Sequence, residues 1–127
     1  MKTIAASLLA IGLCLPAVAQ DLPGDPEKGE RVFRKCMACH AVGDDARNKV
    51  GPELNGILGR TTAAVEDFSY SDAMAEKGAE GHVWTAEELD AYLADPKGFI
   101  PGNKMAFPGL RKPQERADVI AYLAGFE

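Results

Sequence analysis

The sequence has 127 residues, of which 26% are charged and 46% hydrophobic, and its formal net charge is −5. This length fits one domain, and the acidic balance argues against a protein that binds nucleic acid. The charge is spread unevenly: residues 28–60 carry a net +3, residues 61–95 a net −8 and residues 96–116 a net +4. Such a molecule could orient as it approaches a charged partner, although the pattern also fits an ordinary solvated surface.

The N-terminal segment has the features of a cleaved export signal. Lys2 is followed by a short apolar run, residues 4–15, and by the small residues of positions 17–19, as in signal peptides and their cleavage sites. A run of about 12 apolar residues is too short to span a membrane, which takes roughly 20. We therefore expect residues 1–19 to be removed, leaving residues 20–127 as a single domain exported to the periplasm.

One of the three cysteines, Cys14, lies inside this leader. A lipoprotein signal would have a small residue before the cysteine, and Leu13 is large. We therefore interpret Cys14 as one of the apolar residues of the signal, without an attached lipid. Cleavage leaves Cys36 and Cys39. In an oxidising compartment such a pair would normally form a disulfide, unless a cofactor takes both sulfurs.

The first predicted helix begins at Asp25, a candidate N-cap, with Pro26 at the first helical position. Phe33 and Cys36 fall on one face at helical spacing. We expect this helix to run to about Cys39.

The run Cys36-Met37-Ala38-Cys39-His40 ends this helix and is the attachment signature of a c-type haem. Two thiols three residues apart project from one turn, close enough to add to two vinyl groups of one porphyrin. The following histidine can present its imidazole to the iron. The motif therefore predicts one covalently bound haem c.

Most of residues 41–71 are expected to form loops, because glycines and a proline interrupt them. So long an irregular stretch suits a compact domain only if it wraps a cofactor that supplies the missing core. A short helix is expected over residues 71–77.

A further helix is expected to open with a capping box formed by Thr85 and Glu88, and Asp95-Pro96 should end it. Residues 96–112 are expected to form a second loop, and residues 115–125 the last helix. With no convincing strand pair, the fold class is all-α, with short helices and long loops.

The fifth iron ligand is predicted to be His40, the better of only two histidines. The other, His82, lies in the turn Gly81-His82-Val83. A lone histidine in a turn is expected to have no ligand role, because ligation needs convergent geometry.

The sixth ligand must come from far along the chain, and Met37, Met74, Met105 and His82 are the candidates. Met37 is too close to the attachment turn to reach the opposite face, and Met74 lies in a helix, where methionine usually packs in the core. Met105 lies in a loop that a proline and a glycine can fix. Ligation by histidine and methionine raises the potential and fills both axial positions, which favours electron transfer over catalysis.

With these residues the chain resembles class I cytochrome c, most closely the bacterial cytochrome c2 subgroup, over residues 29–123. The matching features are Gly29 with Phe33 and Tyr122, Lys49-Val50-Gly51-Pro52, residues 55–60, residues 68–73, Trp84, Tyr92, Pro96 and the loop of residues 101–107. The resemblance implies a cytochrome c fold wrapped around one haem.

The resemblance also implies roles around that haem. Arg60, Tyr70 and Trp84 would donate hydrogen bonds to the propionates, which are costly to bury without donors. Pro52 would carry the carbonyl that orients the proximal histidine, and Tyr92 would contact the methionine side of the haem. Trp84 and Tyr92 could alternatively be core aromatics alone.

Two positions depart from the family pattern: Met74 stands where asparagine is frequent, and Asn103 where threonine is frequent. Both belong to the polar network near the haem. The chain is also acidic, unlike the basic mitochondrial members. Basic side chains could still surround the exposed haem edge, namely Lys35, Lys49, Lys97, Lys104, Arg111 and Lys112.

The implied function is that of a monomeric periplasmic electron carrier, not an enzyme. It would take single electrons from a cytochrome bc1-type complex and pass them to a terminal oxidase, a photosynthetic reaction centre or a reductase, through transient electrostatic docking. The alternatives are a C-x-x-C thiol–disulfide oxidoreductase, which should show a thioredoxin-like pattern that is missing here, a zinc module, which lacks a second ligand pair, and a haem peroxidase, which needs a vacant iron position.

Overall fold

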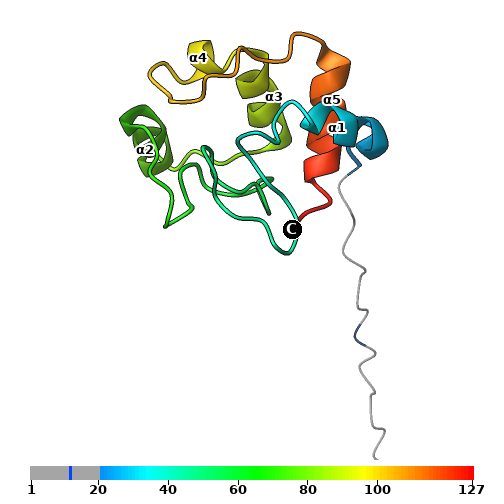
Figure 1. Cartoon of the computed structure of the whole chain (residues 1–127), viewed down its shortest axis with the longest axis horizontal. Helices are drawn as coiled ribbons and strands as arrows, with labels where there is room; N and C mark the ends of the chain where they lie inside the picture. Colours follow the sequence, from blue (N-terminus) through cyan, green and yellow to red (C-terminus); the bar gives the residue numbers. More distant parts are fainter. Residues whose placement is uncertain (1–11, 13–20) are drawn as a thin grey trace, which may run out of the picture.

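The computed structural model describes residues 21–127 together with Gly12, so the predicted leader, including Cys14, otherwise lies outside the described residues. The described part contains the α-helices α1 (Pro26–Phe33), α2 (Asp72–Ala79), α3 (Ala86–Ala94), α4 (Pro96–Phe99) and α5 (Pro113–Leu123). Loops join these helices, except that only Asp95 separates α3 from α4 (Figure 1). No strand occurs in this part, where the only β-type pairing is an isolated bridge between Thr61 and Val83, and the all-α prediction is confirmed.

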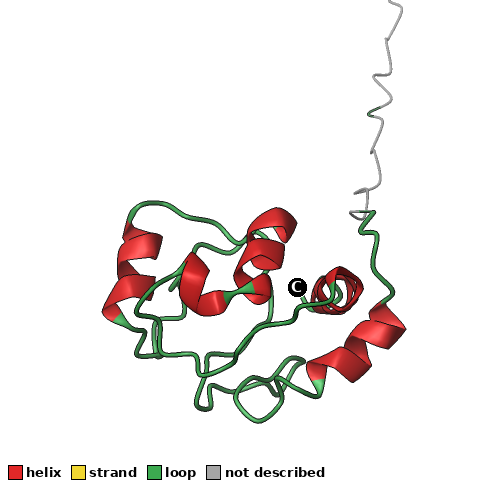
Figure 2. Cartoon of the chain, turned by 90° about the horizontal axis from the view of Figure 1, so that it is seen from above, coloured by secondary structure: helices red, strands yellow, loops and turns green. Residues whose placement is uncertain are grey.

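The first and last helices pack directly against each other (Figures 1 and 2). A Cβ atom on Gly29 would lie 1.9 Å from the carbonyl oxygen of Asp118 and 2.8 Å from Cβ of Tyr122, so only glycine fits this crossing. Beside it, the rings of Phe33 and Tyr122 lie 5.5 Å apart. The glycine and aromatic pair predicted from the sequence therefore forms the contact between α1 and α5.

The first helix starts as predicted but ends earlier. The Asp25 side chain accepts hydrogen bonds from the backbone N–H groups of Glu27 and Lys28, which caps the helix. Regular α-helix stops at Phe33, and the chain continues in tighter turns to Cys39. Successive bonds to the third preceding carbonyl, such as Cys36 N–H to Phe33 O at 2.8 Å, replace the α-helical pattern.

The middle helices differ in detail from the expectation. Helix α2 passes through Gly78 to Ala79, and α4 occupies the start of the segment expected to be loop. At α3, the Thr85 hydroxyl accepts the backbone N–H of Glu88 at 3.2 Å, which is one half of the predicted capping box. The Glu88 carboxylate turns instead toward His82.

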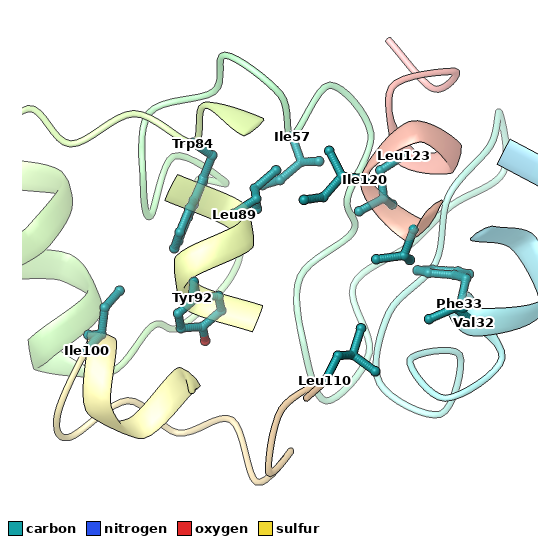
Figure 3. Packing of buried hydrophobic residues seen from close by; sticks show 11 residues of the cluster. Val32, Phe33, Ile57, Trp84, Leu89, Tyr92, Ile100, Leu110, Ile120 and Leu123 are labelled. Carbon is teal, nitrogen blue, oxygen red and sulfur yellow. The ribbon is translucent and has the colours of Figure 1, made fainter. Parts of the chain in front are cut away.

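Buried hydrophobic side chains form two groups that meet at Ile57 (Figure 3). One group belongs to the α1–α5 crossing, and the other gathers around α3. The cluster comprises Val32, Phe33, Ile57, Trp84, Leu89, Tyr92, Ile100, Leu110, Val119, Ile120 and Leu123. Among residues 21–127, no helix is long and apolar enough to cross a membrane.

Candidate haem-binding site

The attachment turn holds both cysteines and His40 on a short, hydrogen-bonded segment. The backbone N–H groups of Cys39 and His40 donate to the carbonyl of Cys36 at 3.1 and 2.9 Å. The Gly51 N–H donates to the Cys39 carbonyl at 2.9 Å, which fixes the following loop to the turn. Both cysteines are partly buried, and they form no disulfide with each other.

The imidazole of His40 is fixed by the loop behind it. Its Nδ1 lies 2.6 Å from the carbonyl oxygen of Pro52, and because a carbonyl only accepts, Nδ1 must carry the proton. Burial lowers the pKa of His40 despite this bond, which favours the neutral ring. Nε2 then keeps a lone pair that can bind a metal, in the arrangement by which outer-shell carbonyls orient ligand histidines.

The glycine before that proline is required by the position of the ring. A Cβ atom on Gly51 would lie 2.5 Å from Cε1 of His40 and 2.9 Å from both ring nitrogens. Any side chain at this position would displace the imidazole or the loop. Gly51 and Pro52 therefore act together, one by allowing close approach and the other by accepting the hydrogen bond.

The cysteine environment is unfavourable for thiol–disulfide exchange. Burial raises the pKa of Cys36 to about 11, whereas redox-active C-x-x-C pairs depend on a thiol whose pKa is lowered. Within residues 21–127 there is also no group of three or more His, Cys, Asp or Glu side chains that could hold a metal ion, as a zinc module would need.

The Met105 loop is pinned by Asn103, which is only 4% exposed. Its Nδ2 donates to the carbonyls of Pro96 and Ile100 at 2.9 and 2.8 Å, and its Oδ1 accepts the Met105 N–H at 2.9 Å. The Lys97 ammonium donates to the Asn103 carbonyl at 3.0 Å. Asparagine at this position thus forms a complete network that fixes the backbone of Met105.

The thioether of Met105 lies beside Tyr92. The Tyr92 hydroxyl donates to Sδ at 3.7 Å, and burial raises the pKa of Tyr92 to about 12, so the hydroxyl keeps its proton. Tyr92 also packs against Trp84, with ring centroids 4.9 Å apart. The predicted neighbour of the methionine side is therefore a hydrogen-bond donor as well as a core aromatic.

Tyr70 lies where the two long loops meet. Its hydroxyl oxygen accepts the N–H of Val65 at 3.1 Å, which leaves its own proton to donate. Tyr70 lines an open groove of about 620 Å³ together with Lys104 of the methionine loop. The Lys104 ammonium donates to the Ser69 carbonyl at 3.3 Å and ties the two loops together.

Arg60 and Trp84 are joined by backbone hydrogen bonds. Gly59 N–H donates to Trp84 O at 2.8 Å, and Trp84 N–H donates to Arg60 O at 2.9 Å. The Arg60 guanidinium, however, binds inside its own loop, 3.4 Å from Oε1 of Glu53 and 3.0 Å from the Asn55 carbonyl. It holds that loop together, and its predicted propionate contact remains a prediction.

Met74, the other departure from the family pattern, packs against the hydrophobic core. Sequence reasoning missed a different polar group: His82 bonds to Thr62 and Glu88. The only sequence signal was the histidine itself. The expectation for His82 concerned only iron ligation by a lone histidine in a turn, whereas in the fold this side chain is only 13% exposed.

The donor set fits a covalently bound haem. Two thiols on one turn can each form a thioether bond, His40 presents a neutral nitrogen, and Met105 offers a soft sulfur on a fixed loop. The Tyr70 hydroxyl has a proton to donate to a propionate.

Comparison with known proteins agrees with this chemistry. A family model described as cytochrome c matches residues 26–126. Cytochrome c-550 of Ancylobacter novellus is 59% identical over 101 residues, covering 80% of this chain and 94% of the relative. Cytochrome c2 of Agrobacterium tumefaciens is 56% identical over 100 residues, covering 79% of this chain and 90% of the relative.

A solved structure gives the same result. That of cytochrome c2 from Rhodospirillum centenum matches with a TM-score of 0.78 and 44% identity, covering 81% of this chain and 98% of the other. The chain therefore belongs to the cytochrome c family, close to bacterial cytochromes c2 and c-550, and is by that membership an electron carrier with one covalently bound haem c rather than an enzyme.

Proposed function

We propose that this protein is a one-electron carrier of the bacterial periplasm, with its haem attached through Cys36 and Cys39 and its iron bound by His40 and Met105. The observation that carries the proposal is the 2.6 Å contact between His40 Nδ1 and the Pro52 carbonyl, which leaves Nε2 as the metal-binding nitrogen. Residues 1–19 would be the leader that directs export before cleavage.

The haem, when bound, supplies a reversible one-electron couple at its iron. The protein fixes the ligands and the polarity around them. The Asn103 network holds Met105 in place, and the Tyr92 hydroxyl donates to its sulfur. With both axial positions occupied by side chains, the iron would have no open position for a substrate, which is why a carrier is favoured over a peroxidase.

The partners would be membrane redox complexes: a cytochrome bc1-type donor, and an oxidase, a photosynthetic reaction centre or a reductase as acceptor. Support comes from lysines beside the candidate site. Lys97 and Lys104 are exposed residues whose ammonium groups bond to carbonyls of the Met105 loop and the Tyr70 loop. An electropositive rim of this kind attracts an acidic docking surface and lets the complex form quickly and dissociate quickly.

Replacement of the proposed methionine ligand tests the site. Met105→Ala should lower the reduction potential and allow added imidazole to bind the iron, as judged by the visible spectrum. Met37→Ala is the control, since Met37 is a methionine whose side chain is 52% exposed, and this variant should leave the potential and ligation near those of the wild type. A Met105→Ala protein with an unchanged spectrum and potential would refute this ligand assignment.

Docking is tested by association kinetics with a purified bc1-type complex. Lys97→Ala and Lys104→Ala should each slow association most at low ionic strength, where charges are least screened. Lys28→Ala on α1 removes the same charge away from the Met105 loop and is the control. Association that is equally fast in all variants at every salt concentration would exclude electrostatic docking through this rim.

A further inference from the structure

The loop that carries Met105 has two halves, and they are fixed in different ways. Asn103 holds the first half through the hydrogen bonds described above. The second half, residues 106–111, contains no helix or strand, and the one backbone–backbone hydrogen bond found there joins the Leu110 N–H to the Leu93 carbonyl of α3 at 2.7 Å. A segment with so few backbone hydrogen bonds depends on side chains for its position.

Arg116 of α5 supplies hydrogen bonds to this second half. Its Nη1 donates to the carbonyl of Leu110 at 2.9 Å and to the carbonyl of Arg111 at 3.2 Å. Its Nε donates to Oδ1 of Asp90, on α3, at 2.7 Å. One guanidinium group therefore connects α5, α3 and the end of the Met105 loop.

The geometry of Arg116 is fixed by its surroundings. The Arg116 side chain is 12% exposed, whereas that of Asp90 is 48% exposed. Because the guanidinium is planar and its N–H groups point in fixed directions, the bond from Nε to Asp90 sets the direction in which Nη1 points. An ion pair with so exposed a carboxylate contributes little attraction, so the main effect of Asp90 is to orient the arginine toward the two loop carbonyls.

The backbone at the end of the loop lies directly against the neighbouring helices. Leu110 is 2% exposed and belongs to the hydrophobic cluster. A Cβ atom on Gly109 would lie 2.8 Å from the carbonyl oxygen of Ala94 and 3.1 Å from Cδ of Pro96. Leu110 is bonded to α3 through its N–H and to α5 through its carbonyl, so this residue is a fixed point of the loop.

We propose that Arg116 and Asp90 form a latch that positions the second half of the Met105 loop and controls how often Met105 leaves the iron. The proposal rests on the proposed electron-carrier function, in which Met105 is the sixth ligand. Asn103 lies two residues before Met105 and Leu110 lies five residues after it, so the methionine is held between two fixed points. An added ligand can replace the thioether only when the loop opens, and the loop opens more easily when one fixed point is lost.

Imidazole binding to the oxidised, haem-loaded protein measures this opening. Imidazole replaces the Met105 thioether without a change of oxidation state, and its apparent affinity is proportional to the fraction of molecules in which the loop is open. Arg116→Ala removes three charge-assisted hydrogen bonds, so the apparent affinity should rise about tenfold or more. Asp90→Ala leaves the two loop bonds but removes the group that orients them, so the rise should be about two- to threefold.

Two further variants test whether the fork geometry of the arginine matters. Arg116→Lys keeps the positive charge, but an ammonium cannot bond to Asp90 and Leu110 through a planar fork, so imidazole should bind nearly as tightly as to Arg116→Ala. Glu115→Gln is the matched control, because it removes the neighbouring ion pair of α5, with Lys35 at 3.5 Å. This pair does not contact the Met105 loop, so Glu115→Gln should bind imidazole as the wild type does.

Amide hydrogen exchange gives a second measurement that needs no added ligand. The Leu110 N–H is released when the second half of the loop opens, so in Arg116→Ala it should exchange about tenfold faster or more. If Arg116 stabilised only the fold as a whole, its removal would lower the free energy of unfolding but leave both local opening and imidazole affinity unchanged.

Two results would therefore overturn the proposal: wild-type imidazole affinity in Arg116→Ala, or wild-type exchange of the Leu110 N–H in the same variant. Asp90 is half-exposed, so Asp90→Ala decides even if Arg116→Ala fails to fold, and wild-type imidazole affinity in Asp90→Ala would then contradict the latch. Failure of the latch leaves the carrier function intact as long as Met105→Ala opens the iron to imidazole. A wild type that binds imidazole as readily as Met105→Ala would instead refute the ligand assignment of the proposed function.

Discussion

The α1–α5 crossing and the loop-rich half around His40 and Met105 are held together by different means. At the crossing, helix backbones approach so closely that a single Cβ atom on Gly29 would overlap the Asp118 carbonyl. Around the site, side chains such as Asn103 bond to loop carbonyls and N–H groups and replace the hydrogen bonds of regular structure. The stability of the crossing therefore depends on the close packing of two helices. The stability of the loops depends on hydrogen bonds from a few polar side chains, so a different kind of substitution should weaken each region.

The largest effect is expected from Gly29→Ala. The added Cβ would lie 1.9 Å from backbone that cannot move without separating the helices, and overpacking of a tight contact costs about 3 kcal/mol or more. This outweighs the gain in helix propensity of about 1 kcal/mol. Chemical denaturation of the haem-loaded protein measures the change in the free energy of unfolding.

Arg31→Ala, at an exposed position of the same helix, should change the free energy of unfolding by less than about 0.5 kcal/mol. If Gly29→Ala changed the free energy of unfolding as little as Arg31→Ala, the close packing of α1 against α5 would not be what stabilises this crossing.

A smaller and more local effect is expected from Asn103→Ala. It removes three hydrogen bonds and leaves the Pro96 and Ile100 carbonyls and the Met105 N–H without this partner. Since each net bond contributes about 1 kcal/mol, the cost should be roughly 2–3 kcal/mol, with a weakened methionine–iron signature in the visible spectrum.

Asn103→Thr introduces the residue frequent in the family, whose hydroxyl can both donate and accept a hydrogen bond, so this variant should be less destabilised than Asn103→Ala. An Asn103→Ala protein with wild-type stability and an unchanged spectrum would contradict the role of this network.

The smallest effect is expected from Asp118→Asn and appears in the dependence on pH. The Asp25 N–H and the Gln114 side chain donate to the Asp118 carboxylate and hold its pKa below the usual range. The contribution to stability is therefore present above the ordinary carboxyl pKa of about 4 and is lost as the pH falls through the lower folded value.

Asparagine keeps an acceptor for the Asp25 N–H but cannot ionise. Asp118→Asn should consequently be less stable than the wild type near neutral pH, and the difference should shrink in acid. Unfolding at a series of pH values measures it, with the exposed Asp45→Asn as the control. A difference that stays constant down to strongly acidic pH would exclude a contribution from ionisation.

The positions of helices α1 and α3 were largely predicted from the sequence. Cap residues and apolar spacing gave the start of α1 and the position of α3, because these signals are local. The end of α1 was placed too late, since apolar spacing cannot distinguish the tighter turns before Cys39 from continued helix.

The side-chain contacts in the loops around His40 and Met105 were less predictable. The C-x-x-C-H motif and the resemblance named the candidate haem residues, but the partner of Arg60 and the bonds of His82 join segments that only the fold brings together. Glu88 shows the limit most clearly: its sequence position predicts a capping box, whereas the folded chain places its carboxylate on His82, six residues earlier.

The central claim is that one porphyrin is bonded to Cys36 and Cys39. Mass spectrometry of the exported protein under denaturing conditions tests it directly, with a double variant that carries both Cys36→Ala and Cys39→Ala measured alongside. The account predicts the mass of residues 20–127 plus one haem for the wild type, retained after unfolding, and no haem on a protein that lacks both cysteines. A bare polypeptide mass for the wild type, produced with the haem-attachment machinery present, would contradict it.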